Sequence, residues 1–346
     1  MGTHNPILHD PDFWTNLRVL ERLQKKKLCL ASNLDNCEGP IIEAHTIPRS
    51  QLRNIATNGK VYEILSTVAD VIRNGGEYTY RERGIGQFSI LNCFCEKHDR
   101  QIFAPVEIEP LVFDTRQLSI LHYRAVGSEL YKKAVAVDAG DHLLKRMIKK
   151  NKSPSDVIDD VTASHTGQMI GMAQIGETLK CCEQAVFTSS YDDTSGLVIK
   201  FKHNPTIMTV GGFIPEYDYN GVQVARVDVF QPASPQMGLS ILATPDGAAV
   251  VYSWLRKEKL CRAFAETLIA QQPDRFTTLI VQTAFEQLEN TCMNIEWWDA
   301  LVPAEQKALL RRAQSGTPSR ERLASCLQFD GVCHAQWDYR DHVFIN

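Results

Sequence analysis

Four thiols and one imidazole in the first hundred residues have the types and spacing of a metal site. The chain has ten cysteines; four form two pairs, Cys29 with Cys37 and Cys93 with Cys95, and His98 follows the second pair closely. Zinc is commonly held by four ligands from two separated turns. We expect Cys29 and Cys37 in the first turn and Cys95 with His98 in the second, with Cys93 as the competing ligand for Cys95. The alternative is that the thiols are small core residues and that the imidazole lies on a helix surface.

The segment between the two cysteine pairs resembles a known nuclease family. EAHTIPRS at residues 43–50 precedes the C-x-x-H arrangement of Cys95 and His98. It is similar to the first motif of the HNH (ββα-metal, treble-clef) nucleases, in which A-H-x-I-P is a frequent form. The resemblance covers residues 29–107. It implies a treble clef built around a structural Zn²⁺ and metal-dependent cleavage of nucleic-acid phosphodiesters.

The resemblance assigns catalytic roles to individual residues. His45 matches the family's general base, and an imidazole that titrates near neutrality and is held by a strand suits that task. Asp99 occupies the position where the family usually has the His that binds its catalytic metal, and a carboxylate is a competent ligand for Mg²⁺ or Mn²⁺. Glu43 lies on the same strand face as His45 and is a second candidate ligand.

Three more residues take supporting roles in this hypothesis. Asn92 is the candidate for the orienting Asn, and Arg49 and Arg53 are the candidates for gripping phosphates. In the alternative interpretation, His45 only hydrogen-bonds to hold the zinc loop, and the module has no catalytic activity.

The elements that must position these residues follow from the hydrophobic patterns. An amphipathic lead-in helix is expected at residues 11–27, a short strand at 41–47, another at 88–94 and a helix from residue 96. Two helices are expected next, at residues 114–137 and 141–150, then a helix at 167–185. Strand-like runs separated by turn signals occupy residues 186–255, and helical patterns follow.

These patterns predict an α+β protein with three parts. The first is an N-terminal zinc-binding, HNH-like domain at residues 1–110, and the second is a helical connector at residues 111–166. The third is a C-terminal α+β domain at residues 167–346, with an antiparallel sheet at about 186–255 and helices at about 257–346.

Bulk properties bound the function. With 346 residues, 44% hydrophobic and 23% charged, the composition is that of a globular protein rather than a disordered or fibrous one. The net charge of −4 argues against nucleic-acid binding over the whole surface, although residues 17–60 are locally basic. No apolar run is long enough to span a bilayer and the N-terminus lacks a signal-peptide layout, so we expect a cytoplasmic protein.

The leading hypothesis is therefore a metal-dependent endonuclease that acts on DNA rather than RNA, in the setting of bacterial defence. The C-terminal domain would recognise a protein partner or form a homo-oligomer. The alternative is a non-catalytic, zinc-stabilised scaffold whose C-terminal domain recognises a partner or a small-molecule signal. The alternatives differ in whether His45 is essential for cleavage or only for stability.

Overall fold

A computed structural model describes residues 15, 18, 19, 21–23, 25–33, 35–150, 155–226, 234–315 and 322–346. Its centre is an antiparallel sheet of eight strands in the order β10-β5-β8-β7-β6-β9-β2-β3. The strands are β2 (Lys60–Leu65), β3 (Thr79–Gly84), β5 (Thr194–Phe201), β6 (Ile207–Phe213), β7 (Met237–Thr244), β8 (Gly247–Leu255), β9 (Thr291–Met293) and β10 (Tyr339–Ile345).

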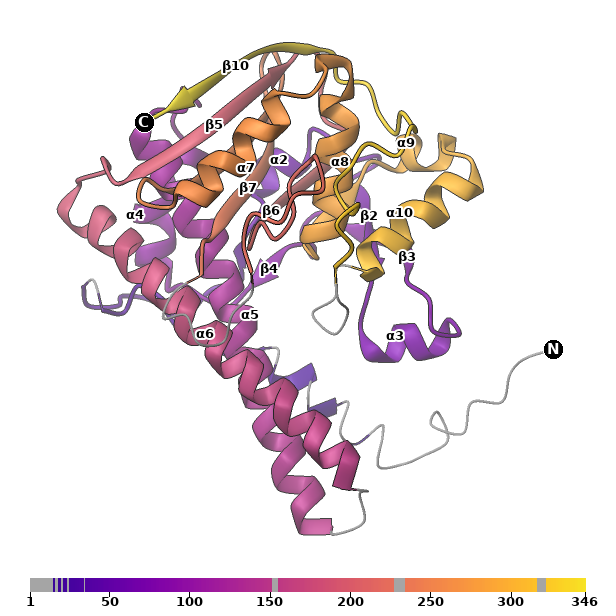
Figure 1. Ribbon diagram of the computed structural model, residues 1–346. Coiled ribbons are helices and arrows are strands. Elements are labelled where there is room, and N and C mark those ends of the chain that lie inside the picture. Colours follow the sequence, from indigo (N-terminus) through magenta and orange to yellow (C-terminus); the bar gives the residue numbers. More distant parts are fainter. Residues whose placement is uncertain are drawn as a thin grey trace.

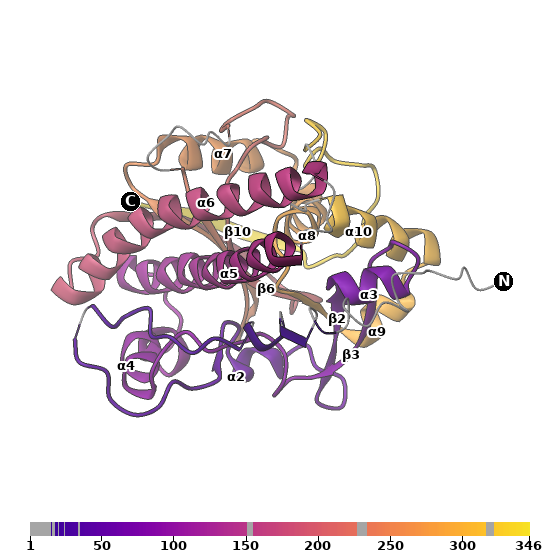
Figure 2. The same cartoon turned by 90° about the horizontal axis from the view of Figure 1, so that it is seen from below.

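Helices cover both faces of this sheet (Figures 1 and 2). One face carries the C-terminal helices, and the other carries the first arm of a long hairpin, with α4 beyond it. The helices are α2 (Arg49–Leu52), α3 (Val68–Arg73), α4 (Glu96–Glu107), α5 (Thr115–Lys150), α6 (Ser155–Thr188), α7 (Lys259–Ile269), the 3₁₀ turn η2 (Pro273–Arg275), α8 (Phe276–Gln287), α9 (Ile295–Ala300) and α10 (Pro303–Ser315).

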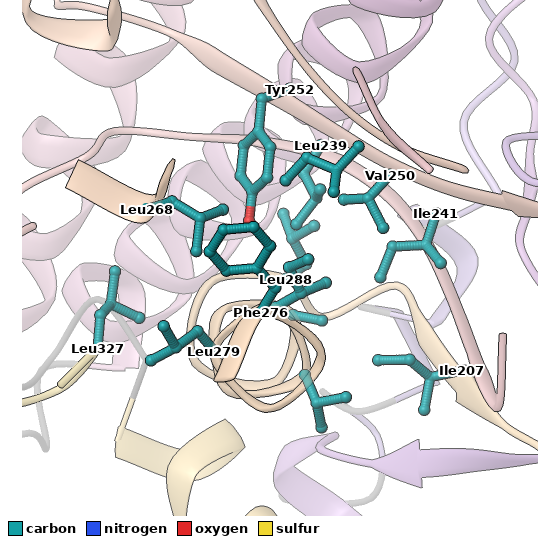
Figure 3. Packing of buried hydrophobic residues seen from close by; sticks show 14 of the residues in the cluster. Ile207, Leu239, Ile241, Val250, Tyr252, Leu268, Phe276, Leu279, Leu288 and Leu327 are labelled. Carbon is teal, nitrogen blue, oxygen red and sulfur yellow. The ribbon is translucent and has the colours of Figure 1, made fainter. Parts of the chain in front are cut away.

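The alternation of apolar residues along the strands explains this layered arrangement. In β5, Leu197 and Ile199 belong to the core under α7 and α8, whereas Val198 between them belongs to the core under α5. Because both faces are covered, β5 to β8 are apolar almost throughout and deeply buried. Figure 3 shows part of the first of these cores, to which Leu279 of α8 and Tyr252 of β8 both belong.

The hairpin of α5 and α6 extends well beyond the sheet (Figure 1). The expected break near Gly140 is wrong, because α5 is one continuous helix through that position. A single glycine costs a helix only about 1 kcal/mol, which packing against α6 offsets. The expected strand at residues 186–190 is also wrong: this segment is the end of α6 and the turn after it.

A smaller pair of strands holds the N-terminal candidate site. β1 (Ala44–His45) pairs antiparallel with β4 (Ile90–Leu91), and α4 follows directly. The residues between them form α2, β2, α3 and β3, and β2 pairs with β9 of the main sheet. Strands from both sides of the expected boundaries at residues 110 and 166 therefore share one sheet, and the division into three domains stays a prediction.

Two strands lie where the sequence pattern predicted helices. β9 joins β6 to β2, and β10 pairs with β5 at the other edge of the sheet. Of the lead-in helix expected at residues 11–27, the described part at residues 15, 18, 19 and 21–23 is helical, and the rest lies largely outside the described residues. Among the described helices, none has the length and apolarity that crossing a bilayer requires.

Candidate metal centre and catalytic cavity

The structure brings Cys29, Cys37, Cys95 and His98 together. Their ligand atoms all lie within 4.8 Å of one another. Nδ1 of the imidazole lies 3.2 Å from Sγ of Cys29, 3.9 Å from Sγ of Cys37 and 3.3 Å from Sγ of Cys95. A tetrahedral zinc ion with Zn–S and Zn–N bonds of about 2.3 and 2.1 Å requires S···N separations of about 3.6 Å. This Cys₃His cluster therefore fits a structural Zn²⁺.

Main-chain hydrogen bonds hold the two ligand-bearing turns side by side. The amide of Leu30 donates to the carbonyl of Cys93 over 2.9 Å, and the amide of Cys95 points at Sγ of Cys29 over 3.4 Å. On the other side of the cluster, the amide of Glu96 donates to the carbonyl of Pro40 over 3.0 Å. The four ligands are thus fixed by backbone pairing as well as by any bound ion.

The chemistry of the ligands suits zinc. Cys95 caps α4 and His98 lies in its first turn, so the helix start presents both. Burial lowers the pKa of His98, which favours the neutral imidazole that a metal requires. Cys93, the competing candidate, lies instead in the apolar core beside α5 and is not part of the group of four.

His45 occupies the strand next to this cluster and faces inward. Its partner in β4 is Ile90, and its ring N–H donates a hydrogen bond to the main-chain carbonyl of Ile85. Nε2 is buried, and no described residue hydrogen-bonds it, so the bond to Ile85 uses the other ring nitrogen. Burial, with a smaller contribution from Arg49, lowers the pKa of His45 and keeps the imidazole neutral near pH 7.

His45 and Asp99 line the same cavity. Its volume is about 10 Å³, which is about what one water molecule needs, and its lining also includes the polar residues Thr46, Arg124 and Ser128. Burial raises the pKa of Asp99 to about 6, although Arg124 opposes this shift. A candidate base and a carboxyl group thus line one cavity with room for about one water.

Arg124 is the residue that sequence reasoning did not assign to the site. Its guanidinium is 4% exposed, pairs with the carboxylate of Glu107 and lies 4.0 Å from the centre of the Phe103 ring. It approaches from α5, which is distant in sequence from the zinc turns, so no local motif could have indicated it. The only available signal was an arginine within the most apolar part of a long helix.

The remaining predicted residues do not line this cavity. Glu43 is exposed at the start of β1, and Arg53 is exposed at the end of α2. Arg49 is exposed and its guanidinium lies against Gly86. Asn92 is half-buried, and its carbonyl accepts a hydrogen bond from the amide of Leu28 over 3.1 Å, which places it in the pairing of the zinc turns.

Comparisons with known proteins give no match. No protein-family model matches the chain, and no curated protein or solved structure matches it either. The interpretation of the site therefore depends on its donor atoms and their geometry.

Proposed function

We propose that the chain is a zinc-stabilised, HNH-type endonuclease whose hydrolytic centre, formed by His45 and Asp99, is closed in this conformation. The observation that carries the proposal is the buried, unpartnered Nε2 of His45 in one cavity with Asp99. Two short strands followed by a helix, with the Cys₃His cluster at the helix start, support the treble-clef arrangement.

His45 has the properties of a general base in this proposal. Its neutral imidazole donates to the carbonyl of Ile85 from one ring nitrogen and has a buried, unpartnered Nε2 that can accept a proton. Asp99, on the first turn of α4, lines the same cavity and would accept a hydrogen bond from the attacking water. A water between them would lose a proton to Nε2 of His45 as its oxygen bonds to phosphorus, while the bond from phosphorus to the leaving nucleotide oxygen would break and that oxygen would take a proton from solvent.

The catalytic Mg²⁺ or Mn²⁺ of the family does not fit the cavity as it stands. Mg²⁺ keeps several waters in an octahedral shell, which a space for one water cannot hold. Glu43, the second expected ligand, is exposed and does not line the cavity. Any step that uses such an ion therefore requires the cavity to open first.

DNA is the proposed substrate, with RNA as the less favoured one. Arg49 and Arg53 are exposed on the helix that follows β1, where they could bind phosphates outside the cavity. Defence of a bacterial cell, in the cytoplasm, is the setting that the family analogy suggests. A protein partner or a second copy would bind through the C-terminal part.

Nicking of supercoiled plasmid in the presence of Mn²⁺ tests this function. We expect slow nicking by the purified protein, and at least a roughly 100-fold lower rate for His45→Ala, since a general base contributes that much or more. His203→Ala is the matched control, because His203 is an exposed histidine in a loop far along the chain. Unchanged nicking in His45→Ala, at equal zinc content, would overturn the proposal.

A non-catalytic scaffold is the second candidate, and the burial of Nε2 of His45 favours it. Nε2 of His45 is inaccessible to solvent, so no phosphodiester reaches it in this conformation. A scaffold predicts no nicking with any divalent metal, and effects of His45→Ala limited to stability. The same assay, with thermal unfolding of both variants, therefore separates the two candidates.

A further inference from the structure

We propose that Arg124 excludes a divalent cation from the His45–Asp99 cavity and so keeps the centre closed until its side chain leaves. This inference concerns the regulation of the proposed nuclease site and rests on that function. It would explain why the cavity is too small for the hydrated Mg²⁺ or Mn²⁺ that the nuclease family uses.

The side chains that hold Arg124 form one stripe along α4. Asp99, Phe103 and Glu107 are spaced four residues apart, which places them on the same face of the helix. Arg124 lies over the Phe103 ring and pairs with Glu107 at one end of the stripe. At the other end, Asp99 lines the cavity together with Arg124, whose positive charge lowers the pKa of Asp99 against the effect of burial.

The charge of Arg124 makes it a competitor of metal ions. A guanidinium remains protonated at any physiological pH, and here it is almost fully buried. A divalent ion bound to Asp99 would lie beside this fixed positive charge in a space for one water. Repulsion between like charges that are close together in a protein interior is screened much less than in water, so this guanidinium disfavours a cation at Asp99.

The moving part is the side chain rather than the helix. Around Arg124, the residues Leu121, Tyr123, Ala125 and Val126 of α5 are buried in the cores under the sheet, so the helix itself is fixed. Glu107, in contrast, is about one-third exposed, so its pairing with Arg124 can exchange with solvent. Release of Arg124 would leave Asp99 and His45 with room for a cation and its waters.

Two measurements that do not depend on nicking test the proposal. Mn²⁺ binding is followed by the electron paramagnetic resonance signal of the free ion, and exposure of His45 by diethylpyrocarbonate modification located by mass spectrometry. Arg124→Met removes the charge and keeps an apolar stem against Phe103. Arg116→Met is the matched control, because Arg116 lies on the same helix and pairs with Glu109 over 3.2 Å, but is exposed.

We expect Arg124→Met to bind one additional Mn²⁺ with a dissociation constant at least about tenfold below that of the wild type. We also expect His45 to be modified several times faster, with neither change in Arg116→Met. Adding Asp99→Asn to Arg124→Met should abolish the gain. Equal Mn²⁺ affinity in the wild type and Arg124→Met, or a gain that survives Asp99→Asn, would overturn the proposal.

A second variant covers the case in which Arg124→Met fails to fold. Glu107→Gln removes the negative charge that pairs with Arg124 but keeps Arg124 itself. We expect smaller increases in Mn²⁺ affinity and in the rate of His45 modification than in Arg124→Met. No increase in either, in a folded and zinc-loaded Glu107→Gln protein, would overturn the proposal. Tight Mn²⁺ binding by Arg124→Met without nicking would refute the nuclease function and leave this inference intact. Nicking by the wild type with unchanged Mn²⁺ affinity in Arg124→Met would refute this inference alone.

Discussion

Cys93 and Cys95 lie two residues apart, yet their thiols have different surroundings. Sγ of Cys95 faces the imidazole of His98 over 3.3 Å, whereas Cys93 lies in the apolar core beside α5. We expect Cys95→Ser to lose its zinc and to unfold at lower temperature, because a weaker ligand replaces the thiolate. Cys93→Ser, its matched control, should retain about one zinc per chain. Metal analysis with thermal unfolding checks both, and zinc loss from Cys93→Ser alone would reverse the assignment.

A single carboxyl group, that of Glu286 in α8, should make the free energy of unfolding depend on pH. Burial raises its pKa to about 7, and Arg322 and Arg312 oppose the shift only in part, while Glu216 adds to it. The folded protein therefore keeps a proton that the unfolded chain loses above about pH 4. Stability should fall as pH rises from about 4 to about 7, by about 3 kcal/mol from this group, and then level off.

Urea unfolding at pH 5 and pH 8 measures this effect. Glu286→Gln should lose this part of the pH dependence, whereas Glu289→Gln, at an exposed position just after α8, should behave as the wild type does. Identical pH dependence in Glu286→Gln and the wild type would show that the buried carboxyl does not titrate in this range.

The sequence was informative about the zinc ligands but not about the cavity. The spacing of Cys95 and His98 at a helix start indicates a ligand pair, because residues three apart lie on the same side of a helix with 3.6 residues per turn. Arg124 could not be assigned in this way, since its role arises only when α5 crosses α4. Glu107, which pairs with Arg124, does not belong to a recognisable sequence motif either.

At the scale of elements, the hairpin of α5 and α6 has a close contact at Gly140. A Cβ at Gly140 would lie 2.5 Å from Nδ1 of His165, whereas a Cβ at Gly167 would meet nothing within 4 Å. Gly167→Ala should raise stability by up to about 1 kcal/mol through helix propensity. Gly140→Ala should lower it by about 1 kcal/mol or more, since the imidazole must move.

Hydrogen exchange in the hairpin, with thermal unfolding, compares these two variants. Faster exchange around residues 135–170 in Gly140→Ala, and slower exchange in Gly167→Ala, is the expected outcome. Equal stabilisation by both substitutions would mean that the helices are not in contact at Gly140.

Elements with one clear period were predictable, and short ones were not. β5 to β8 follow their hydrophobic patterns, whereas α5 was expected as two helices and α6 only from residue 167. β9 has three residues, too few to show a period, and the segment at residues 186–190 combines β-branched and aromatic residues that tertiary packing placed in α6. The apolar run from Val343 to Ile345 at the end of β10 is typical of a strand. We nevertheless expected helices at about residues 257–346.

At the scale of the whole molecule, the N-terminal part shares its core with the main sheet. Ile47, Leu52 and Val61 pack with Met208 and Val210 of β6. We expect residues 1–110, expressed alone with zinc, to remain largely unfolded by circular dichroism and nuclear magnetic resonance, because this apolar surface would be exposed. A cooperatively folded fragment would instead support an independent domain ending near residue 110.

The zinc cluster is the feature on which the position of His45 and Asp99 depends, and its coordination can be measured directly. We predict that the zinc K-edge X-ray absorption spectrum of the purified protein shows three sulfur ligands at about 2.3 Å and one nitrogen at about 2.0 Å. A protein that retains no zinc, or a spectrum with a shell of nitrogen and oxygen ligands, would contradict the account.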